Sequence, residues 1–186
     1  MIGCEQLIPN LSAEIIPHES IADITLGLDF EHFTANSKYQ LINNYSELES
    51  TYSKKDKWLV LHRNEVLPWG DHIHEIHCFW NEIITLIFNF NTKKLEFIYA
   101  GPGYQGKLLG LLGIGDRLDS VKDQYNFYFE GDKHYLEYKE DTDKAGELVP
   151  VEIDTNYRTA YSQEYNDQII EGFLVYLLPE ERGDLT

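Results

Sequence analysis

The stretch that decides the fold reads Tyr104-Gln-Gly-Lys-Leu-Leu-Gly-Leu-Leu-Gly-Ile-Gly-Asp-Arg-Leu-Asp-Ser-Val121. Residues 112–114 alternate between apolar and small, as in a buried strand. Gly115 follows and allows a tight turn, because it has no Cβ. Asp116 then occupies the N-cap position of a short helix, with Asp119 at capping-box spacing. The pattern predicts a loop, a buried strand, a glycine turn and a short helix.

A similar phrase occurs earlier in the chain. It reads Ile24-Thr-Leu-Gly-Leu-Asp-Phe-Glu-His-Phe33 and superposes on residues 112–121 without a gap. Each copy has alternating apolar residues, a glycine directly after them (Gly27 or Gly115), and then an apolar pair at helical spacing. The repetition predicts an α+β fold with two similar halves, each a short helical segment packed on antiparallel β-strands.

The predicted organisation has three parts in one compact unit: an N-terminal arm over residues 1–20, a first half over 21–103 and a second half over 104–186. Alternating apolar residues around short polar turns predict one hairpin over residues 83–99 and another over 125–138. A later short strand contains Pro150, which favours the edge of a sheet. Residues 37–56 carry no periodicity that assigns them to an element.

Composition restricts the class of protein. The chain has 186 residues, of which 42% are hydrophobic and 13% aromatic, enough to form a core. It contains no apolar run of 18 residues, and its start lacks the basic and hydrophobic segments of a signal peptide. Cys4 and Cys78 are too few and too far apart for a disulfide scaffold. We therefore expect a cytoplasmic protein with reduced thiols and no membrane partner.

Negative charge dominates the surface chemistry. The formal net charge is −17, from 32 acidic and 15 basic residues. Residues 116–186 hold 18 of the acidic and 7 of the basic residues. Such a surface repels nucleic acid and anionic membranes, and it attracts a basic protein. The alternative that charge leaves open is an acidic protein whose charge only keeps it dispersed.

One cluster has the residue types of a metal site. It reads Asp71-His-Ile-His-Glu-Ile-His-Cys78. If it forms a strand, His72 and His74 share a face and His77 points away; if it forms a loop, the three histidines can converge. Because a closed zinc site needs four ligands, we expect no metal, and a metal-dependent or hydrolytic enzyme at residues 71–78 is the alternative function.

Other catalytic or cofactor motifs are missing from the sequence. The loop Gly101-Pro-Gly-Tyr-Gln-Gly106 has glycines but does not complete the motif GxxxxGK[ST] of a phosphate-binding loop, because Leu108 follows Lys107. Neither GxSxG nor HExxH occurs. The expectation is a protein without catalytic residues and without a cofactor.

The second half combines aromatic and acidic residues. Along the strand from 125 to 129, Asn126 and Tyr128 face opposite to the other three residues. Tyrosines bordered by carboxylates suit contact with a basic protein, although an ordinary two-sided sheet with half-buried tyrosines fits the same pattern. The residues predicted to bind the partner are Tyr128, Glu130, Asp132, Glu137, Glu140, Asp141 and Asp143.

These motifs resemble those of small bacterial immunity proteins that accompany toxins of contact-dependent growth inhibition. The resemblance covers residues 15–140 and depends on Gly27, on Tyr104-Gln-Gly-Lys107 and on Gly113-Ile-Gly-Asp-Arg-Leu118. The layout is also similar to the repeat of the β-lactamase-inhibitor-protein type and of outer-membrane assembly lipoproteins. The resemblance implies an inhibitor that covers the basic active-site cleft of a toxin domain, and the toxin domain expected is an RNase. After the enzyme at residues 71–78, an envelope assembly or scaffold module is the third alternative.

Overall fold

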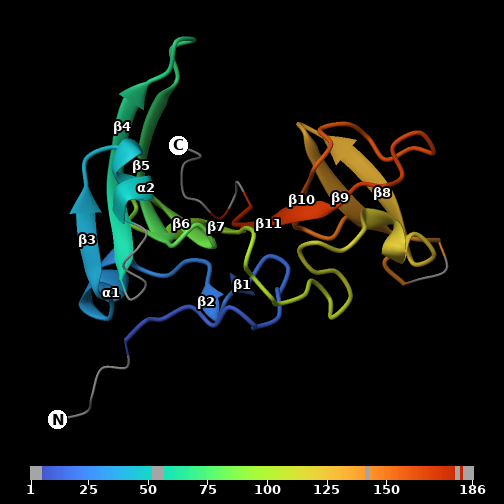
Figure 1. The fold of residues 1–186 in the computed structure, drawn as a ribbon, viewed down its shortest axis with the longest axis horizontal. Helices are drawn as coiled ribbons and strands as arrows, with labels where there is room; N and C mark the ends of the chain where they lie inside the picture. Colours follow the sequence, from blue (N-terminus) through green and yellow to red (C-terminus); the bar gives the residue numbers. More distant parts are fainter. Residues whose placement is uncertain (1–5, 52–56, 141–142, 179–180, 182–186) are drawn as a thin grey trace.

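One long β-sheet dominates the structure. The computed structural model describes residues 6–51, 57–140, 143–178 and 181 (Figure 1). The sheet contains nine strands: β3 (Tyr39–Ile42), β4 (Trp58–Val66), β5 (His72–Trp80), β6 (Ile84–Asn89), β7 (Leu95–Ala100), β8 (Tyr125–Glu130), β9 (Lys133–Tyr138), β10 (Glu152–Thr155) and β11 (Ile170–Tyr176). A separate small pair comprises β1 (Ser20–Ile21) and β2 (Ile24–Thr25). The helical elements are α1 (Phe30–Ala35), α2 (Ser46–Thr51) and the 3₁₀-helix η1 (Leu118–Val121).

The spatial order of the strands is β3-β4-β5-β6-β7-β11-β10-β9-β8. Only β3 and β4 run parallel; every other neighbouring pair is antiparallel. The sheet extends along the longest axis of the molecule, with β3 at one end and β8 at the other (Figure 1). The last strands of the two halves, β7 and β11, therefore meet in the middle.

The pairing on one side of this central pair repeats on the other side. Tyr99 of β7 lies opposite Leu174 of β11. β6 and β7 slip register at Glu96, and β10 and β11 slip register at the corresponding Glu171. Following the pairs outward places β4, β5, β6 and β7 in correspondence with β8, β9, β10 and β11. The central pair thus marks a pseudo-two-fold relation between two four-stranded units.

The two glycine turns occupy matching places in these units. Their φ angles are 79° and 89°, in the left-handed region that glycine adopts without strain. In the first turn, the Gly27 N–H donates to the carbonyl oxygen of Leu95, the first residue of β7, and the Leu28 carbonyl oxygen accepts the Leu95 N–H. In the second turn, Gly115 and Asp116 make the same two bonds with Ile170, the first residue of β11.

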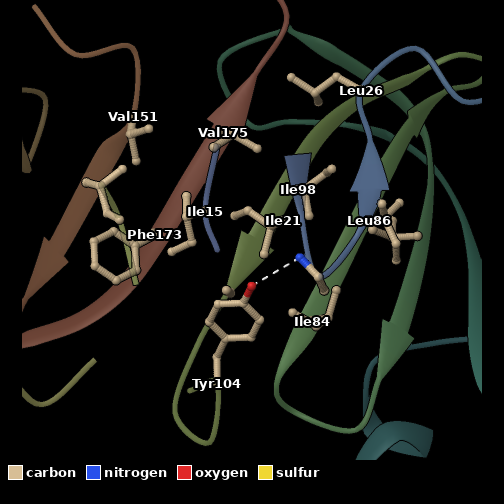
Figure 2. Packing of buried hydrophobic residues seen from close by; sticks show 14 of the residues in the cluster. Ile15, Ile21, Leu26, Ile84, Leu86, Ile98, Tyr104, Val151, Phe173 and Val175 are labelled. Carbon is tan, nitrogen blue, oxygen red and sulfur yellow. Dashed lines mark hydrogen bonds between the residues drawn. The ribbon is translucent and has the colours of Figure 1, made fainter. Parts of the chain in front are cut away.

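The main core lies on the face of the sheet that we call the inner face. It collects Leu86, Ile98 and Phe173 from the central strands, all fully buried, with Ile15 and Ile21 from the N-terminal segment above them (Figure 2). Residues from both halves contribute to this single cluster. Burial of this many apolar side chains is the main stabilising contribution to the fold.

Tyr104 fastens the glycine-rich loop to the N-terminal segment. Its hydroxyl donates to the Ala13 carbonyl oxygen at 2.7 Å and accepts the Ala22 N–H at 3.1 Å (Figure 2). At Gly106, a Cβ would stand 1.7 Å from the Ala13 carbonyl oxygen, so only glycine fits there. The glycines of residues 101–106 therefore serve close packing.

The predicted α+β class is wrong, because the protein is mostly β. The described residues contain one nine-stranded sheet and only two α-helices of six residues each. α1 buries a single side chain, that of Phe33. Without a longer apolar stripe a helix gains little from packing, whereas the abundant aromatic and β-branched residues favour strands.

The predicted helix cap at Asp116 is also wrong. Its carboxylate accepts the Gly113 N–H at 2.8 Å and pairs with Lys107, so it closes the loop. Asp119 receives two N–H groups from Arg117, and the segment forms only the 3₁₀-helix η1. Pro150 lies just before β10, which is an interior strand and not an edge.

Both predicted hairpins are confirmed, as β6–β7 and β8–β9. In the part of the chain that the structure describes, no helix combines the length and apolarity needed to cross a bilayer.

Candidate protein-binding surface

The outer face of the second half carries tyrosines and carboxylates. Strands β8, β9 and β10 place their alternate side chains on the face opposite the main core, because successive residues of a strand point to opposite sides. We call this group the second-half outer face; it contains Tyr128, Glu130, Lys133, Tyr135, Glu137, Glu152 and Asp154. The intervening residues of the same strands include Leu136 and Ile153, which are buried in the core.

Two tyrosines form the apolar part of this surface. The rings of Tyr128 and Tyr135 lie opposite each other on β8 and β9, with centroids 6.2 Å apart. Tyr128 is 45% exposed. The Tyr135 hydroxyl donates to a Glu152 carboxylate oxygen at 3.2 Å, and burial together with the Glu152 charge raises the pKa of Tyr135. The Tyr135 side chain therefore stays neutral at physiological pH.

Carboxylates outnumber cations on the second-half outer face by four to one. Its one ammonium group, on Lys133, pairs with Asp154. Glu137 accepts an N–H from the Asn126 side chain at 3.1 Å, which orients it without neutralising it. The field over the two tyrosines is therefore negative, which favours lysine and arginine in a partner.

The seven residues predicted from the sequence do not all gather on this face. Tyr128, Glu130 and Glu137 lie on it. Asp132 lies in the β8–β9 turn, 4.0 Å from Arg158, and Glu140 and Asp143 are exposed beyond the end of β9. Asp141 lies outside the described residues.

Sequence reasoning missed Tyr135, Glu152 and Asp154 as members of the surface. The signal was present in the alternation of Glu152 and Asp154 around the apolar Ile153, which is fully buried. Pro150 led to the prediction of an edge strand, so β10 was not expected beside β9.

The histidine cluster forms strand β5, the first of the two conformations considered. His72 and His74 lie on one face with their rings stacked 5.8 Å apart, and His74 also stacks on Phe90 at 3.7 Å. His77 points to the opposite face and is 6% exposed. The sheet therefore separates the three histidines, and the described residues include no group of three or more side chains able to hold a metal ion.

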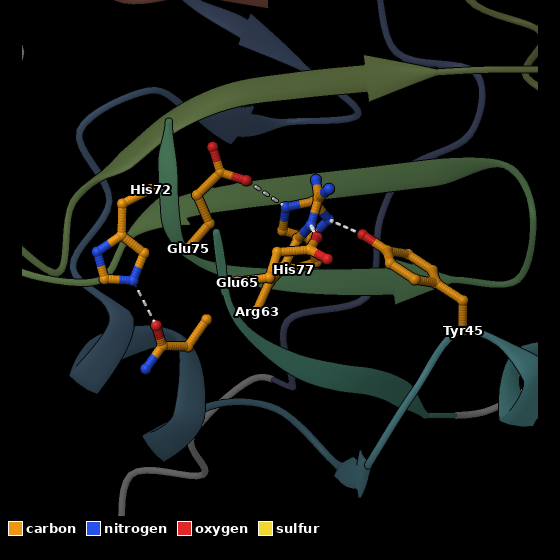
Figure 3. Close-up of polar contacts among 7 residues, drawn as sticks. Tyr45, Arg63, Glu65, His72, Glu75 and His77 are labelled. Carbon is orange, nitrogen blue, oxygen red and sulfur yellow. Dashed lines mark hydrogen bonds and ion pairs between the residues drawn. The ribbon is translucent and has the colours of Figure 1, made fainter. Parts of the chain in front are cut away.

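His77 instead belongs to a hydrogen-bonded chain on the outer face of the first half (Figure 3). The Tyr45 hydroxyl donates to His77 Nδ1 at 3.1 Å, and His77 Nε2 donates to the Glu75 carboxylate at 2.6 Å. The bond from His77 holds the pKa of Glu75 below its usual range, while burial raises the pKa of Tyr45. Tyr45 directly precedes α2, so the Tyr45–His77–Glu75 chain anchors that helix to the sheet.

Comparison of the chain with protein-family models, with curated proteins and with solved structures found no match.

Proposed function

We propose that this protein binds and neutralises a cationic protein, a toxin domain of nuclease type, by covering the basic cleft in which that domain acts. The observation that carries the proposal is the second-half outer face, where two adjacent tyrosines lie within a ring of carboxylates. Binding requires no reaction on this chain, in keeping with a sequence that lacks catalytic motifs.

A nuclease has to attract the phosphate backbone, so lysine and arginine surround its active site. A protein of net charge −17 is drawn to such a cleft, and the attraction accelerates encounter at low ionic strength. Charge alone gives a complex little specificity and a short lifetime. Tyrosines increase both, because each ring buries a large area on binding while only two side-chain torsions become fixed.

The resemblance to immunity proteins supplies the partner class. An immunity protein has to act where its toxin would harm the producing cell, so we place this protein in the cytoplasm together with its partner. The proposal commits to a one-to-one complex in which the toxin's cations face Glu130, Glu137 and Glu152.

The test is co-expression of the full chain with the toxin domain encoded beside it. The proposal expects that cells survive only when both are made and that the two proteins purify together. The complex should weaken as salt rises, since the contacts are between opposite charges. Growth arrest in the presence of the full chain, with no co-purification, would contradict the proposal.

A further inference from the structure

Strand β8 is the open end of the sheet in the described part of the chain. Its six residues, Tyr-Asn-Phe-Tyr-Phe-Glu, include neither a proline nor a lysine. Exposed edge strands are normally protected by such residues, because their free N–H and C=O groups otherwise pair with another chain. The β8 edge lacks that protection.

The first half shows what occupies the corresponding edge there. β4, the counterpart of β8, pairs with β3 in parallel register from Tyr39–Trp58 to Ile42–Leu61. The chain then passes through Tyr45 into α2, which lies over the outer face. Ile42 and Leu48 of this segment cover Leu59, Leu61 and Phe79 in a second apolar cluster.

The second half has no such segment. Residues 36–57 separate α1 from β4, whereas only residues 122–124 separate η1 from β8. The strand register makes Tyr128 the counterpart of Leu59, and Tyr135 the counterpart of Phe79. Among the residues that the structure describes, the place that β3 and α2 fill in one half is thus open in the other, above two tyrosines.

We infer that an extended basic segment of a partner protein pairs with the β8 edge and lays its side chains over the second-half outer face. Strand pairing supplies main-chain hydrogen bonds, and alternate side chains reach Tyr128 and Tyr135. The lysine and arginine side chains of that segment lie over the outer face, where their stems pack on the tyrosine rings and their charges meet Glu130, and the apolar side chains between them point to the opposite face. This inference rests on the proposed function and specifies how the partner is held.

Charge decides between the possible occupants. A second copy of this chain would bring another net charge of −17 against the same carboxylates. The other end of the sheet, β3, is four residues long and lies beside Lys57, which bonds to Gln40 on that strand. A basic segment therefore suits β8 and does not suit β3.

The experiment measures amide hydrogen exchange on the full chain at low salt, with a short peptide of alternating valine and lysine as the probe. We expect the β8 amides to exchange about tenfold more slowly with the peptide, while those of β3 stay unchanged. A peptide of alternating valine and glutamate should have no effect. Tyr128→Ala should weaken peptide binding about tenfold. Tyr39→Ala is the matched control, since Tyr39 is 43% exposed on the opposite edge strand and Tyr128 45%.

Three results would overturn strand addition: no change in β8 exchange, slowing of β3 instead, or slowing of β8 without peptide as protein concentration rises. The same exchange measurement on the complex with the toxin domain separates the two proposals. If the toxin domain is neutralised while the β8 amides exchange freely, strand addition fails and the proposed function stands. If the lysine peptide protects β8 but no toxin domain is neutralised, strand addition stands and the proposed function fails.

Discussion

The two halves of the sheet share a strand register but differ in what lies over their outer faces. In the first half, α2 and β3 cover Leu59 and Phe79, which are 3% and 7% exposed. In the second half the corresponding positions hold Tyr128 and Tyr135, and Tyr128 is 45% exposed. The backbone pairing alone therefore does not determine whether a face is core or surface.

The two halves differ in residue type at corresponding positions of the outer face, according to whether another segment of the chain covers that face. An apolar side chain gains free energy only when another group removes it from water, so leucine and phenylalanine suit the half that carries residues 36–57. Tyrosine tolerates both states, because its ring is apolar and its hydroxyl can bond to water or to a carboxylate. An open face with tyrosines is suited to a cover that arrives from another molecule.

Polar contacts differ between the halves in the same way. His77 in the first half joins Tyr45 to Glu75 beneath the cover. Its counterpart in the second half is Lys133, which pairs with Asp154 on an open face. The contact of His77 holds α2 against the sheet, whereas the ion pair of Lys133 with Asp154 attaches no covering segment to the second-half outer face.

The largest expected effect distinguishes the covered leucine from its open counterpart. Leu59→Ala should lower the free energy of unfolding by about 3 kcal/mol, because it opens a cavity beneath α2. Tyr128→Ala should lower it by less than about 1 kcal/mol, because Tyr128 is already 45% exposed and its removal opens no enclosed cavity. Urea unfolding followed by circular dichroism measures both. Equal losses would mean that the two faces are covered alike.

The next effect tests whether the open face is the one that binds. Replacing both Glu130→Lys and Glu137→Lys should weaken binding of the toxin domain about thirtyfold, close to 2 kcal/mol, through the association rate. Stopped-flow mixing at several salt concentrations measures this.

The matched control is the pair Glu31→Lys and Glu82→Lys, two exposed carboxylates of the first half that make the same change in net charge. If both double variants slow association equally, then net charge and not the second-half outer face governs encounter.

Local patterns of the sequence predicted the two hairpins and the glycine turns, but the buried strand predicted at residues 112–114 is wrong, because Leu112 forms only an isolated bridge with Leu108. Gly27 and Gly115 stand at left-handed turns, and the hairpins form where the alternation of apolar residues ends in short polar loops. These features depend on a few neighbouring residues, so a single sequence contains them.

Long-range pairing could not be predicted in the same way. Nothing near β7 in the sequence indicates that it pairs with β11, some 75 positions later, since Tyr99 and Leu174 meet only through the global fold. The same limit applies to the surface. Tyr135 and Glu152 come together because β9 and β10 are neighbours in the sheet, and no local sequence pattern indicates that pairing.

The Tyr45–His77–Glu75 chain predicts an acid-sensitive contribution in the first half. The folded state lowers the pKa of Glu75, so its contribution is present above the ordinary glutamate pKa of about 4.3 and is lost as pH falls through the lowered value. The loss should be about 1 kcal/mol, since the side chain is partly exposed to solvent.

Urea unfolding of Glu75→Gln at a series of pH values checks this, with Glu82→Gln as the control. The Glu75→Gln protein should show a shallower decline in unfolding free energy below the ordinary glutamate pKa. A decline as steep as that of the unmodified chain would show that the contact to His77 does not stabilise the folded state.

The smallest effect lies at the centre of the sheet, where the halves meet. Tyr99 and Leu174 are counterparts, and of the two only Tyr99 has a side chain that titrates. Burial, with the charges of Asp154 and Glu171, raises the pKa of Tyr99 to about 12. In a spectrophotometric titration of the folded chain, Tyr99→Phe should remove a late component equal to about one of the thirteen tyrosines. Glu171→Gln should move that component to lower pH, because it removes one nearby negative charge. If Glu171→Gln leaves that component unmoved, the negative field of the second half does not extend to the central strands, and the acidic surface ends at β10.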